Sequence, residues 1–125
     1  MSGTVHFKGA FPIGDTDVAN LPVKHLGPAI GYYTLVLGFV LVSREEGRAV
    51  LQRDEARIGL AENGQDPEQA SCYFAVSDVE GLRRELEAKG IEPTAIRVDQ
   101  HEGKQYRVCF AREPYGVCFC FGQQI

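Results

Sequence analysis

The cysteines Cys118 and Cys120 are the side chains of this sequence with the clearest chemical potential. They lie in EPYGVCFCFG (113–122), where Glu-Pro-Tyr-Gly predicts a tight turn and the following residues predict a strand. Side chains alternate along a strand, so both thiols share one face and three apolar side chains share the other: Val117, Phe119 and Phe121. A neighbouring cation such as Arg57 would activate a thiol by lowering its pKa; otherwise each cysteine is a small buried hydrophobe.

A second chemical candidate is the pair His101 and Glu102, in the stretch DQHEGKQY. A histidine beside a carboxylate can exchange protons with a substrate, although an exposed loop accounts for the same two residues. The spacing of the serine, cysteine, histidine and aspartate residues predicts no catalytic triad.

Composition narrows the class of protein. The chain has 125 residues and a net charge of −4, and no run of Lys or Arg offers a surface for nucleic acid. No apolar segment approaches the roughly 20 residues that a membrane helix needs. The first residues lack the layout of a signal peptide, and the four cysteines form no C-x-x-C pair. We therefore expect a cytoplasmic protein with free thiols and no nucleic-acid or membrane partner.

The sequence pattern of the elements that must position these residues occurs twice in the chain. NLPVKHLGPAIGYYTLVLGF starts at Asn20 and YFAVSDVEGLRRELEAKG starts at Tyr73, with Val23 matching Val76. Each copy predicts a short strand, an amphipathic helix and a glycine stop, at Gly38 and Gly90.

The second helix has the clearer signals. Ser77 and Glu80 fit a capping box, in which each side chain accepts a free backbone N–H at the start of the helix. Two ion pairs at i,i+4 spacing are expected on its exposed side: Glu80–Arg84 and Glu85–Lys89.

Three strand candidates follow each helix. They span 39–44, 48–53 and 56–61 in the first copy, and 94–98, 105–111 and 117–122 in the second. Each half therefore reads as a βαβββ unit, and the fold class is α+β. One half can bury only one side of its sheet, so the two halves must pack together, with helices on the outer face and a concave surface opposite.

Three segments, in order, resemble the motifs of the vicinal oxygen chelate superfamily, which includes glyoxalase I, extradiol dioxygenases and bleomycin-resistance proteins. They are LPVKHLGPAIGYYTLVLGF, FAVSDVEGLRRELEAKG and FAREPYGVCFCFGQ. The resemblance covers 17–123 and implies a domain at 17–125 with halves at 17–62 and 70–123. Residues 1–16 then form an N-terminal extension, with an extra strand around 5–11.

The resemblance implies a cupped sheet, usually completed in a homodimer, and four inward positions that hold a divalent metal in the family's enzymes. Here these positions carry Val18, Gly59, Ser71 and Cys120. Such ions need three or more protein donors, so we expect a metal-free member without a cofactor. A one-residue error in strand register would invert every side chain, and Glu62 would then come near the second position.

If those four positions face the cup, the alternation of side chains along each strand predicts which neighbours face it too. The expected ligand-binding residues are Asn20, Arg57, Ser71, Tyr73, Cys118 and Cys120. Arg57 could hold a carboxylate or phosphate, and Tyr73 could stack on a ring or donate a hydrogen bond. Alternatively, Arg57 is a solvated residue at a strand edge, and Tyr73 is a packed side chain that contacts no ligand.

The leading hypothesis is a metal-independent small-molecule binding protein that resembles the bleomycin-resistance branch. The alternative is a metal-dependent lyase, isomerase or dioxygenase of the same superfamily, with ligands shifted to residues such as Glu62 or His101. A third possibility is an interaction domain whose cup is filled by its own side chains or by a partner segment.

Overall fold

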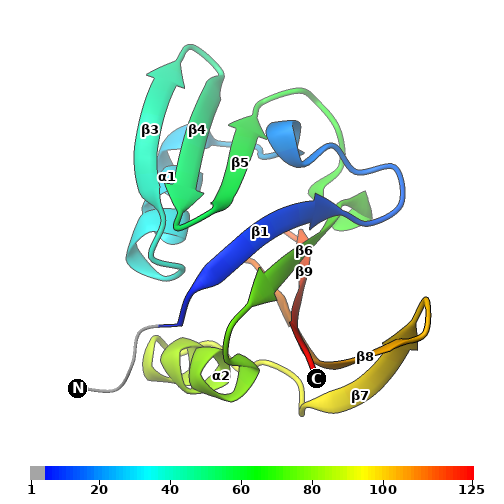
Figure 1. Cartoon of the computed structure of the whole chain (residues 1–125). Coiled ribbons are helices and arrows are strands. Elements are labelled where there is room, and N and C mark those ends of the chain that lie inside the picture. The colour runs from blue at the N-terminus through cyan, green and yellow to red at the C-terminus, as the bar shows by residue number, and fades with distance from the viewer. Residues whose placement is uncertain (1–4) are drawn as a thin grey trace.

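The computed structural model describes residues 5–125, and in them two β-sheets pack with two α-helices and two short 3-10 helices (Figure 1). Sheet A has the strand order β1-β6-β9-β8-β7, and sheet B has the order β2-β5-β4-β3. Helix α1 packs on sheet B and helix α2 on sheet A. The predicted α+β class is confirmed.

The first half of the chain forms sheet B. Its elements are η1 (Val18–Asn20), β2 (Leu21–Pro22), α1 (Leu26–Leu35), β3 (Val40–Glu45), β4 (Arg48–Arg53) and β5 (Ala56–Ala61). The three long strands lie where the sequence places them. The opening strand is shorter than expected, because the Asp17 carboxylate accepts the Ala19 N–H and turns the chain into a 3-10 helix. Val18 and Asn20 therefore lie on η1 and not on a strand.

The second half repeats the pattern in sheet A. Its elements are η2 (Pro67–Gln69), β6 (Ser71–Val76), α2 (Val79–Ala88), β7 (Arg97–His101), β8 (Lys104–Arg112) and β9 (Cys118–Gln124). The strand expected at 94–98 begins at Arg97. Thr94 bonds Phe110 through both its backbone and its hydroxyl, so regular pairing with β8 starts only beyond it.

The strand β1 (Phe7–Pro12) precedes both repeats and pairs antiparallel with β6 at the edge of sheet A. Figure 1 shows it on the side of sheet A that faces sheet B, where it contacts β5. Phe7 pairs with Val76 and Phe11 with Tyr73, because a bulge between Phe7 and Gly9 shifts the register. The bulge turns Phe7 into the core, whereas Phe11 stays half exposed on the opposite face.

Helix α2 begins differently from the prediction. Asp78 is its N-cap and accepts the Gly81 N–H, while the Ser77 hydroxyl accepts the N–H of His6. The capping box is therefore wrong, because the chain before β1 uses the serine.

Both predicted ion pairs on α2 are also wrong. Glu85 binds Arg53 of β4, and Glu80 binds Arg107 of β8. Arg53 is only 9% exposed and needs a carboxylate partner, which explains why Glu85 turns inward and away from its own helix.

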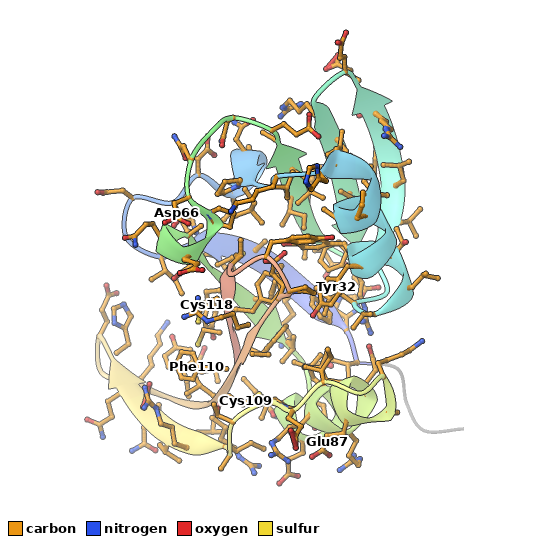
Figure 2. All side chains as sticks on the ribbon, turned by 180° about the vertical axis from the view of Figure 1, so that it is seen from behind. Tyr32, Asp66, Glu87, Cys109, Phe110 and Cys118 are labelled. Carbon is orange, nitrogen blue, oxygen red and sulfur yellow. The ribbon has the colours of Figure 1, made fainter. Side chains whose placement is uncertain are left out.

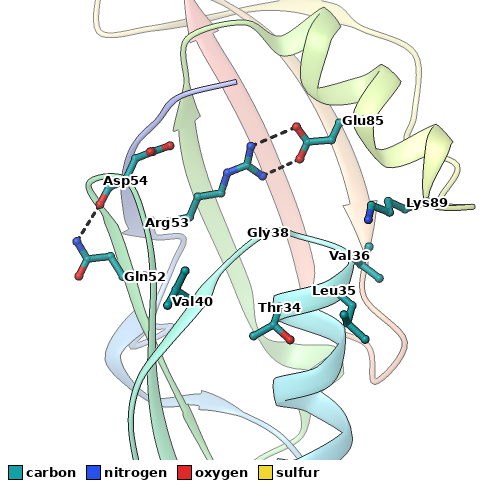
Figure 3. A pocket seen from close by; sticks show the side chains of 10 residues that line it. All are labelled: Thr34, Leu35, Val36, Gly38, Val40, Gln52, Arg53, Asp54, Glu85 and Lys89. Carbon is teal, nitrogen blue, oxygen red and sulfur yellow. Dashed lines mark hydrogen bonds and ion pairs between the residues drawn. The ribbon is translucent and has the colours of Figure 1, made fainter. Parts of the chain in front are cut away.

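The core is shared between the halves. Aromatic rings from β1, α1, β6, β9 and the α1–β3 loop meet mostly edge to face: Phe7, Tyr33, Phe39, Phe74, Phe119 and Phe121. Val117, Phe119 and Phe121 are fully buried, so the predicted alternation of β9 is confirmed. Figure 3 shows Arg53 reaching from β4 to Glu85, which ties sheet B to α2. None of the helices formed by residues 5–125 is long and apolar enough to cross a membrane.

Candidate functional site

The face of sheet A opposite α2 carries a hollow of about 550 Å³. The sheet curls, so that β1 at one edge and β7 and β8 at the other form its two sides (Figure 1). Figure 2 labels two consecutive residues of β8, of which Cys109 points toward α2 and Phe110 into this open side. Every residue that lines the hollow belongs to sheet A or to the end of β1, and none comes from sheet B.

Tyr73 of β6 lies on the floor of the hollow. Its hydroxyl oxygen lies 2.1 Å from the position that a Cβ on Gly122 would take, so the ring rests over β9 at a glycine. Phe11 stands beside it, with ring centroids 6.3 Å apart. Burial raises the pKa of Tyr73 to about 12, so its hydroxyl stays protonated and can donate a hydrogen bond.

Strand β8 supplies the opposite wall through Tyr106, Val108 and Phe110. Phe110 pairs with Cys120 across the ladder, and the Arg97 guanidinium lies 5.0 Å from the centre of its ring. Arg97 also forms an ion pair with Asp99, with Nε and Oδ1 3.1 Å apart. The rim of the hollow therefore carries a carboxylate that already has a cationic partner.

The cysteines of β9 face the hollow side of the sheet, as the alternation predicts. Cys120 lines the hollow, and Cys118 lies one pair further along the strand, opposite Ser71. Burial raises the pKa of the Cys120 thiol to about 12, with a smaller contribution from nearby groups including Asp99. Arg57, the cation considered as its activator, lies on the other sheet. The Cys120 thiol is therefore protonated and weakly nucleophilic, and its side chain forms part of the wall of the hollow.

The six predicted ligand-binding residues divide between the sheets. Tyr73 and Cys120 line the hollow, while Ser71 and Cys118 share its sheet face beyond its edge. The Ser71 N–H donates to the Thr16 hydroxyl, which fixes the start of β6.

Asn20 and Arg57 lie away from the hollow within one chain. Asn20 on η1 donates to Asp17, and its Oδ1 accepts a hydrogen bond from Arg48. Arg57 is exposed on β5, where its Nε donates to Gln52 at 3.1 Å. The structure does not bring these two residues to the other four.

The four positions at which the resemblance implies metal ligands do not fit a metal. Val18 and Gly59 belong to the first half, and Ser71 and Cys120 belong to sheet A. A Cβ on Gly59 would lie 1.9 Å from the Ala19 carbonyl oxygen, so η1 already covers this part of β5. Within residues 5–125, no three His, Cys, Asp or Glu side chains gather as a metal site. One hydroxyl and one protonated thiol are too few donors.

Glu62, the residue that a register error would bring into play, has another role. Its carboxylate accepts the Leu26 N–H at 2.8 Å, at the first turn of α1. His25 occupies the N-cap position but makes no side-chain hydrogen bond, so Glu62 supplies the missing cap from the end of β5.

Two further hollows are weaker candidates. One of about 590 Å³ lies among polar loops, where Asp17 and Asp66 already accept backbone N–H groups. The other, of about 500 Å³, lies where α1, β4 and α2 meet, and its Arg53 and Glu85 bind each other (Figure 3). The hollow of sheet A combines aromatic walls with the phenol hydroxyls of Tyr73 and Tyr106, a mixture typical of small-molecule sites.

The residues of this hollow that the sequence reasoning missed include its aromatic side chains Phe11, Tyr106 and Phe110. Tyr106 and Phe110 could have been found, because a tight turn at 113–116 pairs the flanking strands and sets Phe110 opposite Cys120. Phe11 could not, because the β1 bulge that turns it toward Tyr73 depends on pairing with β6, and Gly9 alone does not specify it.

Known proteins share this architecture. The chain is similar to the bleomycin resistance determinant of transposon Tn5, with 24% identity, a TM-score of 0.71, and coverage of 88% of this chain and 98% of that one. It is also similar to the bleomycin-binding protein of Streptomyces verticillus in complex with copper(II)-bleomycin, with 18% identity, a TM-score of 0.67, and coverage of 89% and 97%. A virulence protein of Salmonella typhimurium has 21% identity, a TM-score of 0.73, and coverage of 92% and 100%.

These likenesses, all below 25% identity, show a common fold. No curated protein has a sequence significantly similar to that of this chain. A family model matches residues 16–121, which contain both βαβββ units and most of the residues that line the hollow. The chain belongs to the Glyoxalase/Bleomycin resistance protein/Dioxygenase superfamily.

Proposed function

We propose that this protein binds a small organic molecule in the hollow of sheet A and needs no resident metal ion to do so. The observation that carries the proposal is the lining of the hollow, which combines aromatic walls with phenol hydroxyls. A concave, mostly apolar site with a few inward polar groups is the usual form of a small-molecule site.

Two lines of reasoning support binding without a metal. The positions that hold metals in the superfamily's enzymes carry Val18, Gly59, Ser71 and Cys120 here, and these side chains make a poor donor set. Two proteins of the same fold are bleomycin-binding proteins, so the fold is suited to hold an organic ligand. The ligand of this chain is a separate question, because the identities are only 18–24%.

We also propose that the site is completed in a homodimer. The hollow is open on one side and lined by sheet A alone, and the apolar side chains Phe11 and Ile13 are exposed at its edge. The face of sheet B opposite α1 carries Arg57 and Gln52, beside the part that η1 covers. A two-fold axis would lay this face over the hollow of the partner and would bring Arg57 to the ligand.

A metal-dependent enzyme is the second candidate, and one observation favours it. Asp99 and His101 lie on the same strand and both line the hollow. Two donors do not make a metal centre, so this candidate needs at least one further donor from a second copy or from the ligand.

Binding to protein purified without added metal tests the proposal. Saturation-transfer NMR with aromatic fragments, in the presence of EDTA, should detect ligands of the wild-type protein. Binding should weaken strongly in Phe110→Ala, which removes one wall, and should be unchanged in the control Leu35→Ala, an exposed residue of α1.

Elemental analysis of the same preparation separates the two candidates. A stoichiometric transition metal, together with loss of binding in EDTA, would favour the enzyme and contradict the proposal. Sedimentation analysis of the wild-type protein tests the dimer. If the dimer brings Arg57 to the ligand, Arg57→Ala should lower ligand affinity in the NMR experiment.

A further inference from the structure

The chemistry of the hollow also indicates which class of molecule it binds, an inference that rests on the proposed function. Two phenol hydroxyls, those of Tyr73 and Tyr106, face the hollow beside the Cys120 thiol. No hydrogen bond joins either hydroxyl to another residue of 5–125, so both are available to a ligand. Each phenol O–H offers a donor to the apolar hollow, and a buried donor without a partner is costly, so the ligand should present acceptors.

The charged groups at the rim do not change the expectation that the ligand presents hydrogen-bond acceptors. The Asp99 carboxylate is held by Arg97, and His101 is exposed beside Glu102. No Lys or Arg is among the described residues that line the hollow, so one chain offers no free cation for a carboxylate or phosphate. A second copy that supplied Arg57 would add one more donor and no acceptor.

The shape of the hollow sets the size and flatness of the ligand. Phe11 on β1 and Phe110 on β8 stand on its two sides, separated by β6 and β9. Three strand spacings correspond to roughly 14 Å, and the two phenyl groups take up part of this width. The remaining room suits two or three fused rings that lie on the floor between aromatic walls.

We propose that the hollow binds a planar, uncharged aromatic molecule of two or three rings whose carbonyl oxygen accepts hydrogen bonds from the Tyr73 and Tyr106 hydroxyls. The site then discriminates against a cation of the same shape, because Asp99, the carboxylate that lines the hollow, is already paired with Arg97.

Two fluorescent probes of one skeleton test this proposal. Acridone is planar, uncharged and carries one carbonyl, whereas proflavine has the same three rings and a positive charge at neutral pH. The chain contains no tryptophan, so either probe can be followed by fluorescence with little background from the protein. Acridone should bind the wild-type protein at least about tenfold more tightly than proflavine, which corresponds to about 1.4 kcal/mol.

Single hydroxyl deletions test the contacts. Tyr73→Phe and Tyr106→Phe should each weaken acridone about three- to tenfold, the usual contribution of one neutral hydrogen bond, and leave proflavine unchanged. Tyr32→Phe is the matched control, since Tyr32 is a partly buried tyrosine of α1 outside the hollow. Thermal unfolding of each variant checks that it is folded.

The outcomes separate this proposal from the proposed function. If proflavine binds as tightly as acridone, or if both Tyr→Phe variants bind acridone like the wild type, the ligand class is wrong while the hollow remains a binding site. If neither probe binds and the fragment experiment also finds no ligand, the proposed function itself fails.

Discussion

The ring of Tyr73 lies across the neighbouring strand at Gly122, and its hydroxyl oxygen occupies the space, 2.1 Å away, that a Cβ at Gly122 would need. Two ring carbons of Tyr73 lie 2.7 Å from the same point. A side chain at position 122 and the observed position of Tyr73 therefore exclude each other. The absence of a side chain at Gly122 decides where the phenol hydroxyl meets the hollow.

The substitution Gly122→Ala should displace Tyr73 and weaken acridone about as much as Tyr73→Phe does. The cost in folding stability should stay within about 1 kcal/mol, because the crowded atoms are the movable end of a partly exposed side chain. Fluorescence titration and chemical denaturation measure the two effects. Wild-type affinity in Gly122→Ala would show that the hydroxyl does not act from this position.

Much of the fold could be predicted because both repeats carry strong local signals. The turn residues around β4 and β5 fix strands at Arg48–Arg53 and Ala56–Ala61, where the sequence places them. Alternation fixes which face of β9 carries the thiols. The positions of these strands and the alternation of their side chains depend on residues that are close together in the sequence, so the sequence alone predicts them.

The unpredicted parts of the site depend on contacts between distant segments. The η1 helix replaces a strand because Asp17 competes for a backbone N–H, and its carbonyl at Ala19 then covers Gly59. The β1 bulge turns Phe11 to the hollow, although the extension has no counterpart in the repeats. Sequence periodicity also gives no information on how the two sheets are placed, so it could not show that Arg57 and Tyr73 lie apart.

The contact between η1 and β5 predicts a large effect of Gly59→Ala. Its Cβ would lie 1.9 Å from a backbone oxygen, which cannot rotate away, so the free energy of unfolding should fall by about 2–3 kcal/mol or more. The matched control is Gly31→Ala in α1, where a Cβ meets nothing within 4 Å. That substitution should raise stability by about 0.5–1 kcal/mol, because alanine favours a helix. Equal denaturation midpoints for the two variants would contradict the packing of η1 on β5.

The buried guanidinium of Arg53 joins the two halves. It donates to the carbonyl oxygens of Leu37 and Val5 and to both oxygens of Glu85, and it lies 4.3 Å from the centre of the Phe7 ring. Arg53→Ala leaves these acceptors without a donor, so the free energy of unfolding should fall by about 3 kcal/mol or more in urea denaturation.

The control for this ion pair is Arg107→Ala. Arg107 of β8 binds Glu80, which lies on α2 as Glu85 does, but the side chains of Arg107 and Glu80 are 34% and 52% exposed. Water screens such a pair, so the loss should be below about 1 kcal/mol. A loss as large as that of Arg53→Ala would show that burial does not set the difference between the two pairs.

The buried carboxyl of Glu113 predicts a dependence of stability on pH. Glu113 is 2% exposed; its Oε1 accepts the N–H groups of Tyr115 and Val117, while its Oε2 has no partner. Burial raises the pKa of this carboxyl, and the backbone hydrogen bonds offset only part of that effect. The folded protein therefore holds this proton to higher pH than the unfolded chain does, and the stabilising contribution is complete below the unfolded pKa and is lost as pH rises through the folded pKa.

Glu113→Gln keeps the Oε1 acceptor and removes the ionisation. It should therefore be more stable than the wild type at neutral pH. The difference should shrink as pH falls through the raised pKa of the folded protein and should level off below the ordinary pKa of a glutamate, about 4.3. Urea denaturation of both proteins across this pH range gives the difference directly, and the paired carboxylates elsewhere in the chain cancel from it. A variant that is less stable at neutral pH, or a difference that does not change with pH, would mean that Glu113 is well accommodated as a charged group.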